Sequence, residues 1–269
     1  MSRAPRARKR FGQHFLVDEG VLQRIADVVR LQPDDRLLEI GPGPGALTTY
    51  LYGGSDVYVA VELDRDMVAP LRARFPDLEL LSADILKVDL DAVLDPPGWR
   101  LVGNLPYNIS SPLLLKLFKH LPLIRDMHFM FQRELGQRIG AQPGSKSWGR
   151  LGVMTQYHCE VEALFDVSPE AFAPPPKVYS QVVRLVPRTT LAEVDMTLFS
   201  RVLQLAFSSR RKRIANGLRG LPLDWARSGV DQDARPDVLS VEEFVSLANA
   251  VDEDALEAAA SESGPGRSR

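Results

Sequence analysis

The sequence predicts an α/β protein in two parts: a mostly parallel seven-stranded sheet with an antiparallel edge, covered by helices, and then a small all-helical domain. Two observations predict this fold class. As far as residue 190, short apolar runs of strand length alternate with segments of helical spacing, which is typical of a parallel sheet with helices on both faces. From Leu191 onward only helical patterns remain.

The elements follow one another in an order that fits this fold. Residues 21–29 form a helix, because Val21, Ile25 and Val28 fall on one helical face with their apolar neighbours. We expect strands at 36–40, 57–61, 78–81, 100–103, 127–131, 161–167 and 181–186. We expect further helices at 46–51, 65–74 and 112–120, and one that begins at Arg133. The last two strands flank a proline-rich stretch and form the antiparallel pair at the sheet edge.

The same patterns set the domain boundaries. Residues 1–16 form a basic N-terminal arm that also begins the binding site, residues 17–190 the α/β domain, and residues 191–251 the helical domain. Residues 252–269 lose apolar periodicity and carry many acidic side chains, which predicts a disordered tail.

The composition is that of a globular protein: 269 residues, of which 45% are hydrophobic and 25% charged. The single cysteine, Cys159, excludes an internal disulfide and a multi-cysteine zinc site, and the four histidines show no metal-ligand spacing. No apolar run approaches the ~18 residues that span a bilayer. We therefore expect a cytoplasmic monomer that binds neither a metal nor a membrane.

The net charge of −2 hides two basic clusters. The first precedes Asp18 and contains Arg3, Arg6, Arg8, Lys9 and Arg10, and the second consists of Arg210, Arg211, Lys212 and Arg213. Because salt screens charges beyond ~8–10 Å, these clusters can bind phosphate although the C-terminal tail is acidic. The apolar neighbours Phe207 and Ile214 place the second cluster on a helix with one buried side. A solvated helix face is the ordinary explanation of such a charge run.

A glycine-rich turn, EIGPGPG (39–45), connects the first strand to the next helix. Gly41, Gly43 and Gly45 let a ligand approach the backbone and supply positive φ. A dinucleotide site requires G-x-G-x-x-G with N–H groups on a pyrophosphate, whereas the residues between these glycines are prolines, which have no N–H. The loop therefore suits a ligand with an adenosine and no phosphate, and S-adenosylmethionine is that ligand.

Two acids end the next two strands. Glu62 follows the second strand, where a carboxylate can accept both ribose hydroxyls. Asp84 ends the third strand, where it can accept the adenine amino group. Either acid alone is explained as well by a solvated strand end, but the carboxyl ends of successive strands meet at one edge of the sheet, beside the glycine loop.

The tetrapeptide NLPY (104–107) ends the fourth strand at that same edge and resembles motif four of the amino-methyltransferases. An adenine amino group is a weak nucleophile because its lone pair is delocalised into the ring. The Asn104 side-chain oxygen and the Leu105 carbonyl can bind its two hydrogens and turn the lone pair toward a methyl group. Pro106 stiffens the turn, and Tyr107 offers a face on which the base stacks. Positioning then carries the rate, and no strong base is required.

The stretch FAPPPKV (172–178) predicts a stiff loop beside this site. A target base must leave its stack to react, and Phe172 supplies a second face for it. Lys177 meets a phosphate. A proline-rich turn between edge strands is the plainer explanation of this stretch taken alone.

Together these segments are similar to the ribosomal RNA adenine dimethyltransferase family, over the chain as far as about Asn249. The matching stretches are RFGQHFL (10–16), EIGPGPG (39–45), NLPYNISSP (104–112), HFMFQRE (128–134), FAPPPKVYS (172–180) and AFSSRRKRIANGL (206–218). The combination is highly specific, although no single stretch is.

The resemblance implies a class I methyltransferase fold and a defined reaction. Such an enzyme transfers methyl groups from S-adenosylmethionine to the exocyclic amines of two adjacent adenosines, two to each. These adenosines lie in the hairpin loop near the 3′ end of 16S rRNA, in a late precursor of the small ribosomal subunit.

The resemblance also implies roles for single residues. His14 and Leu16 would contact the cofactor, Gly41 its methionine part, and Asn104 both cofactor and target amine. His14 departs mildly from the family, since many relatives have Asn there and both side chains form hydrogen bonds. The residues expected to hold RNA phosphates are Arg8, Lys9, Arg10, Lys177, Arg210, Arg211, Lys212 and Arg213. Arg213 and Ala215 stand where relatives commonly carry Thr and Arg, which concerns RNA contacts and not the chemistry.

Four other functions stay open. A large-subunit adenine methyltransferase of the antibiotic-resistance type is the nearest, and NLPYNISSP and RRK favour the small-subunit type. A non-catalytic ribosome-assembly or transcription factor on this fold would not need the intact Glu62 and Asn104. A small-molecule methyltransferase would not need the basic clusters, and the glycine spacing disfavours a dinucleotide oxidoreductase.

Overall fold

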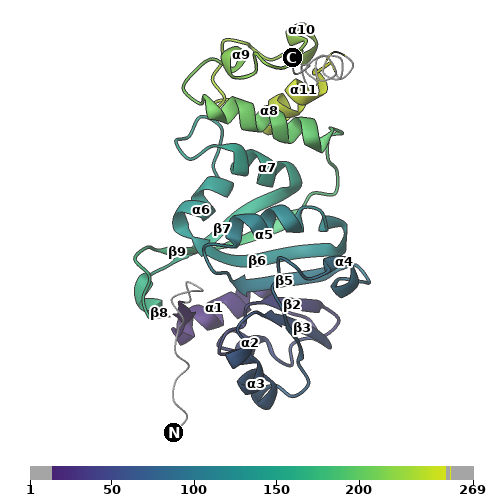
Figure 1. The fold of residues 1–269 in the computed structure, drawn as a ribbon. Coiled ribbons are helices and arrows are strands. Elements are labelled where there is room, and N and C mark those ends of the chain that lie inside the picture. Colours follow the sequence, from purple (N-terminus) through teal and green to yellow (C-terminus); the bar gives the residue numbers. More distant parts are fainter. Residues whose placement is uncertain (1–13, 253–254, 256–269) are drawn as a thin grey trace, which may run out of the picture. The chain divides into compact units, whose positions relative to one another are not determined.

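The computed structural model describes residues 14–252 and residue 255. They form two compact units (Figure 1). The first comprises the chain up to Gln137 together with Cys159–Pro187, and the second comprises Arg138–His158 together with the chain from Arg188 onward. Most of the predicted arm and tail (1–13, 253–254 and 256–269) lies outside the described residues, and so do the candidate RNA-binding residues Arg8, Lys9 and Arg10.

The first unit is built on one seven-stranded sheet, as predicted. Its strand order is β4-β3-β2-β5-β6-β9-β7, in which β2 to β6 are parallel and β9 runs antiparallel to both β6 and β7. The strands are β2 (Arg36–Ile40), β3 (Val57–Glu62), β4 (Glu79–Ser82), β5 (Trp99–Asn104), β6 (Ile124–Gln132), β7 (Cys159–Val167) and β9 (Ser180–Pro187). The order reverses between β2 and β5, and ligands in open α/β sheets bind at the carboxyl ends of strands beside such a reversal.

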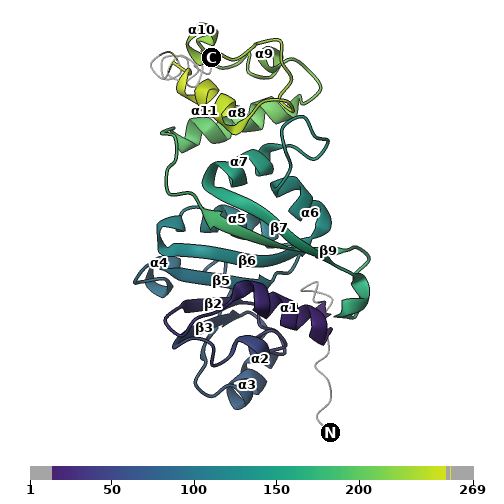
Figure 2. The ribbon, with the colours of Figure 1, turned by 180° about the vertical axis from the view of Figure 1, so that it is seen from behind.

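Helices cover both faces of this sheet. Apolar side chains of α1, α2 and α3 share one core with Leu37, Val102 and Met130 of the sheet, whereas α5 lies on the opposite face (Figure 1 and Figure 2). The helices of this unit are α1 (Glu19–Val29), α2 (Thr48–Leu51), α3 (Arg65–Arg74), α4 (Leu90–Val93), α5 (Ser110–Leu117) and the start of α6 (Arg133–Ile139), with short 3₁₀ turns at Leu121–Leu123 and Pro169–Ala171. Of the helices in the described residues, none has the length and apolar character to cross a membrane.

A second, two-stranded sheet pairs the start of the described chain with the proline-rich stretch. In it, β1 (Phe15–Leu16) pairs antiparallel with β8 (Phe172–Ala173). The N–H groups of Val17 and Asp18 both donate to the Ala171 carbonyl, at 2.8 and 3.2 Å. These contacts hold the residues around His14 at the edge of the large sheet.

The second unit is helical, and it includes a helix that the sequence analysis did not predict. Its helices are α7 (Arg150–His158), α8 (Met196–Ser208), α9 (Ile214–Gly217), α10 (Trp225–Ser228) and α11 (Val241–Asn249). The sequence places one boundary near residue 190, but α7 belongs with the later helices. The Tyr157 ring of α7 packs on the Phe199 ring of α8, with centroids 5.0 Å apart, and the Trp148 indole donates to the Leu239 carbonyl at 2.9 Å.

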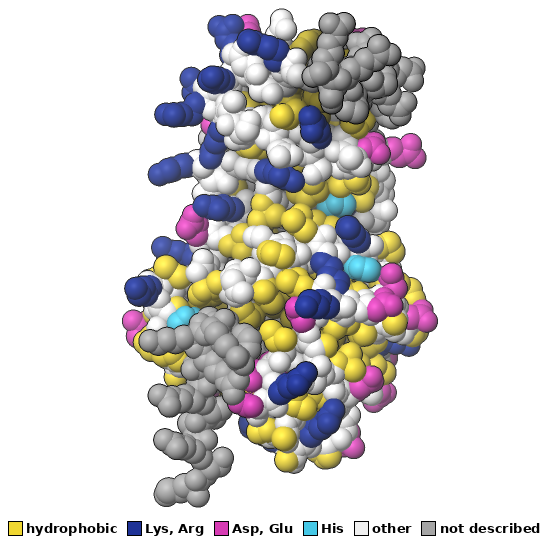
Figure 3. All heavy atoms as spheres, viewed as in Figure 1, with side chains coloured by type: hydrophobic (Ala, Val, Ile, Leu, Met, Phe, Trp, Pro, Cys, Tyr) yellow, Lys and Arg dark blue, Asp and Glu magenta, His cyan; other side chains and the backbone are white. Residues whose placement is uncertain are grey.

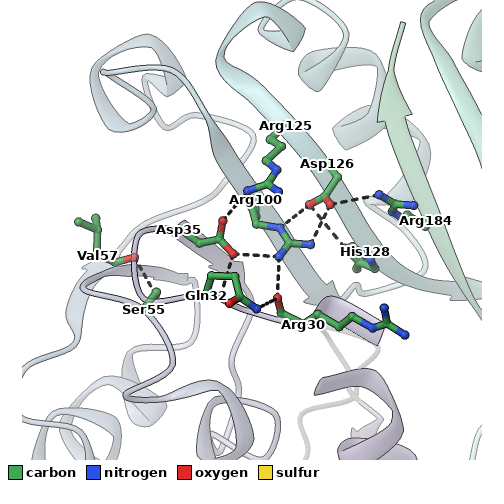
Figure 4. Close-up of polar contacts among 10 residues, drawn as sticks. All are labelled: Arg30, Gln32, Asp35, Ser55, Val57, Arg100, Arg125, Asp126, His128 and Arg184. Atoms are coloured by element: carbon green, nitrogen blue, oxygen red, sulfur yellow. Dashed lines mark hydrogen bonds and ion pairs between the residues drawn. The ribbon is translucent and has the colours of Figure 1, made fainter. Parts of the chain in front are cut away.

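A buried ionic network ties together β5, β6 and the turn after α1 (Figure 4). Nε and Nη2 of Arg100 donate to the two carboxylate oxygens of Asp126, each at 2.8 Å. Nη1 of Arg100 donates to Asp35 at 2.9 Å. These three residues are only 6%, 3% and 4% exposed.

Further partners complete the network. Arg125 and the backbone N–H of Gln32 donate to Asp35, at 2.7 and 2.9 Å, and Arg184 Nη2 lies 3.7 Å from Asp126. Burial alone would raise the pKa of Asp35, but hydrogen bonds from Gln32 and Arg100 and the charges of the two arginines hold this pKa below its usual value. The carboxylate is therefore ionised and paired in the folded chain.

We expect Arg100→Ala to lower the free energy of unfolding by about 3–5 kcal/mol, because it leaves two carboxylates buried without their main partner. Arg125→Ala is the matched control, since it removes a partner of the same Asp35 but one whose side chain is 61% exposed. That control should lose about 1 kcal/mol or less. Urea unfolding at pH 7 measures both, and equal losses would contradict a central role for Arg100.

Candidate active site

The glycine-rich loop turns the chain from β2 toward α2. Gly41, Gly43 and Gly45 have φ of 70°, 57° and 81°, in the left-handed region that glycine tolerates. Their N–H groups donate to the Val61 carbonyl, to Glu62 Oε2 and to the Pro42 carbonyl, each at 2.9 Å. Within residues 41–45, all of them described, no backbone N–H is therefore left for a phosphate.

Glu62 ends β3 beside this loop. Its Oε2 accepts from Gly43 and its Oε1 accepts from the backbone N–H of Asp64 at 2.7 Å. The residue is 5% exposed, and this burial raises the pKa of the carboxyl although the two backbone hydrogen bonds oppose the rise. Two carboxylate oxygens offer about four acceptor positions, so the group can also receive a ligand hydroxyl.

Asn104 ends β5, and its amide is oriented by the start of the described chain. Nδ2 of Asn104 donates to the His14 carbonyl at 3.1 Å. One of the two hydrogens on the amide nitrogen is thus used, and among the described residues the side-chain oxygen Oδ1 stays available as an acceptor.

The Tyr107 ring is held from two sides. Its hydroxyl shares a hydrogen bond of 2.9 Å with Ser180 Oγ of β9. The His14 ring stacks on it, with centroids 6.0 Å apart and an angle of 27° between the planes. His14 Nδ1 in turn lies 2.8 Å from the Pro174 carbonyl. His14 therefore joins the Asn104–Tyr107 turn to the proline-rich loop.

Most of the predicted site residues line one cavity of the first unit. The predicted residues that line it are His14, Leu16, Gly41, Gly43, Glu62, Asn104, Leu105, Pro106 and Tyr107. In the described part of the chain, no three His, Cys, Asp or Glu side chains gather as a metal site would require.

Three predicted residues do not line this cavity. Gly45 packs against Phe75, where an added Cβ would come within 2.7 Å of the ring. Asp84 Oδ1 accepts from the Leu86 N–H at 3.0 Å, and its contact with adenine stays a prediction. Phe172 is 4% exposed and belongs to the core beneath α1. The prediction of a free Phe172 face is corrected accordingly, because pairing of β8 with β1 turns this ring inward.

The predicted helix for the second basic cluster is also wrong. α8 ends at Ser208 and α9 begins at Ile214, so residues 209–213 form the turn between them. Adjacent cations repel one another less when the chain turns and spreads them. Arg213 pairs with Asp233 at 2.9 Å and Arg210 lies 3.7 Å from Asp237.

The other basic candidates are exposed: Arg211 and Lys212 in this turn, and Lys177 in the proline-rich loop. Figure 3 shows further Lys and Arg side chains on the helical unit. The structure thus leaves Arg211, Lys212 and Lys177 accessible to a polyanion.

Sequence reasoning missed two polar residues of the cavity, Glu39 and His128. Both lie inside the apolar strands β2 and β6. The Oε2 atom of Glu39 accepts from the Tyr58 hydroxyl at 2.6 Å and the Thr48 hydroxyl at 2.7 Å. Burial raises the pKa of Glu39 to about 7, against the effect of these two hydrogen bonds. The signal that could have found both residues is a titratable side chain within a buried strand.

Glu39 makes stability depend on pH with a defined sign. Since its folded-state pKa of about 7 exceeds the ordinary 4.5, the folded chain binds more protons between these values, and stability falls as pH rises through them. Glu39→Gln should remove this loss, which amounts to at most about 3 kcal/mol. Urea unfolding at pH 4.5, 6 and 8 measures it against Glu79→Gln, the same change at an exposed position. An unchanged pH dependence in Glu39→Gln would contradict the assignment.

Comparison with known proteins agrees with this geometry. Residues 4–253 match the family described as "Ribosomal RNA adenine dimethylase". The chain is 48% identical over 259 residues to a protein of Pseudomonas syringae pv. tomato named "Ribosomal RNA small subunit methyltransferase A", covering 93% of this chain and 97% of that protein. A protein of the same name from Pseudomonas putida is 49% identical over 253 residues, covering 91% and 94%.

Two solved structures share the fold over 88% of this chain and 99% of theirs. A dimethyladenosine transferase from Plasmodium falciparum has a TM-score of 0.76 at 25% identity. The 23S rRNA methyltransferase ErmE has a TM-score of 0.68 at 27% identity. Fold, cavity and sequence agree, and the chain belongs to the ribosomal RNA adenine dimethylase family.

Proposed function

We propose that this enzyme transfers methyl groups from S-adenosylmethionine to the exocyclic amines of two adjacent adenosines in the 3′-terminal hairpin loop of 16S rRNA. The product is N6,N6-dimethyladenosine, made on a small-subunit precursor late in assembly. The observation that carries the proposal is that one cavity holds both the glycine loop and the Asn104–Tyr107 turn. The 48% identity to proteins named small-subunit methyltransferases favours this substrate over the large subunit.

The cavity fits S-adenosylmethionine. An adenosine needs acceptors for its ribose hydroxyls, and Glu62 supplies carboxylate oxygens for them. A ligand without phosphates does not require free backbone N–H groups, and the glycine loop has none left in residues 41–45. Space around Gly41 is open, since a Cβ added there meets no atom within 4 Å. When bound, the cofactor supplies a methyl group that its sulfonium already activates.

The turn that ends β5 positions the target amine. Asn104 lines the cavity and its Nδ2 donates to the His14 carbonyl, so Oδ1 is the proposed acceptor for an amine hydrogen. The Leu105 carbonyl is the proposed second acceptor. Together they direct the nitrogen lone pair, which is the positioning effect on which this reaction depends. Tyr107, held by Ser180 and His14, offers its ring as the stacking surface.

Asn104→Ala should lower kcat by about 10²–10³-fold, because it removes an acceptor that acts at the reacting nitrogen. The assay incubates full-length protein and labelled S-adenosylmethionine with small subunits from cells that lack the modification, and then digests the RNA to nucleosides. Asn108→Ala, the same change at an exposed position of the following turn, is the control and should stay within a few-fold of wild type. No label in small-subunit RNA, or label when large subunits are supplied in their place, would contradict the proposed substrate.

We propose that Arg211 and Lys212 hold RNA phosphates. In the described residues neither forms an ion pair, unlike Arg210 and Arg213. The double variant Arg211→Ala/Lys212→Ala should reduce the slope of log affinity against log salt by about 1–2, because each phosphate contact contributes ~0.7–0.9. Arg74→Ala/Lys87→Ala removes the same charge from the first unit. An equal effect of both pairs would mean that only net charge matters.

A further inference from the structure

Lys116, near the end of α5, binds the loop that follows β4. Its Nζ atom donates hydrogen bonds to the backbone carbonyls of Ile85 and Val88, at 3.0 and 2.5 Å. Burial lowers the pKa of Lys116, and the charges of Asp84 and Asp89 oppose this effect. A partly buried ammonium group thus uses two of its three donors to hold one loop.

One peptide group in this loop is held at both of its ends. The carbonyl of Ile85 accepts the hydrogen bond from Lys116. The N–H of Leu86, which belongs to the same peptide group, donates to Oδ1 of Asp84 at 3.0 Å. Rotation of this peptide group would break both hydrogen bonds. Lys116 therefore fixes the group to which the Asp84 carboxylate is bound.

The loop lies on the side of the site where the adenine of the cofactor is expected. Since the sheet order begins β4-β3-β2-β5, the residues that follow β5, β3 and β4 succeed one another along the carboxyl edge. The Ala83 N–H donates to the Glu62 carbonyl at 3.0 Å, so the loop starts beside the residue proposed to bind the ribose. An adenosine with its methyl end at Asn104 and its ribose at Glu62 then directs its base toward Asp84.

We propose that Lys116 is a positioning residue for adenine recognition: by holding this loop, it aligns the Asp84 carboxylate with the 6-amino group of the cofactor. The inference rests on the proposed function and on the predicted contact of Asp84 with that amino group. A carboxylate oxygen accepts a hydrogen bond only when distance and angle are right. Without Lys116, the peptide group between Ile85 and Leu86 can rotate, and the carboxylate loses its fixed direction.

Isothermal titration of the full-length chain tests this with two ligands. They are S-adenosylhomocysteine and its purine riboside analogue, in which hydrogen replaces the 6-amino group. Lys116→Met keeps a side chain of similar length without a donor. It should raise the Kd for S-adenosylhomocysteine about tenfold, the loss of one hydrogen bond to a charged group, and change the Kd for the analogue by less than about twofold.

Two further variants of this region serve as controls. Lys116→Arg keeps a cationic donor and should recover part of the affinity for S-adenosylhomocysteine. Lys119→Met is the same change at an exposed position just after α5 and should alter neither Kd.

A double variant tests whether Lys116 acts through Asp84. Asp84→Ala alone should weaken the binding of S-adenosylhomocysteine at least as much as Lys116→Met does. Adding Lys116→Met to Asp84→Ala should then raise the Kd by less than about twofold more, because residues that act as a unit are not additive. Independent effects of the two changes would contradict the proposed role.

Each other outcome separates this inference from the proposed function. Equal weakening of both ligands by Lys116→Met, or no weakening of either, overturns the role of Lys116. Equal binding of both ligands by the wild-type chain also overturns it and leaves the cofactor proposal standing. Failure of the wild-type chain to bind S-adenosylhomocysteine overturns the proposed cofactor itself. If Lys116→Met does not fold, as judged by its melting temperature, Lys116→Gln gives the same comparison with a shorter polar side chain.

Discussion

The site depends first on the buried pairing of Arg100 with Asp126. The two residues lie opposite each other on β5 and β6, and both oxygens of the carboxylate are bound by the guanidinium. A slip of one residue in strand pairing would turn every side chain to the other face and leave these charges buried and apart. The pairing therefore fixes the strand register, in which Asn104 lies opposite Met130 and Val102 lies opposite His128.

The sequence predicted the large sheet well because its strands carry long apolar runs between clear turns. β2 and α3 have the bounds that periodicity indicates. The small β1–β8 sheet could not be predicted in this way, since each strand has two residues and only tertiary contact pairs them. α7 was missed for a related reason. It is buried on most sides, so its sequence lacks the one-sided pattern by which a surface helix is found.

The predictable part of the site consists of residues that end strands. Gly41, Glu62 and Asn104 each follow an apolar run, and parallel pairing alone brings such ends to one edge. Phe172 was misplaced because its direction depends on which strand it pairs with, which no local pattern encodes. Glu39 and His128 were missed because a polar residue in a buried strand looks like a satisfied core residue until the cavity beside it is known.

The backbone N–H groups of the glycine loop are already hydrogen-bonded within the protein, and this affects which cellular nucleotides can compete for the cavity. ATP, GTP and related nucleotides are abundant, and many loops of this kind hold them by their phosphates. Here the loop has no N–H left between residues 41 and 45, and the Glu62 carboxylate beside it disfavours a polyanion. The phosphates of a nucleotide therefore find no backbone donor in residues 41–45, which disfavours such nucleotides at this loop.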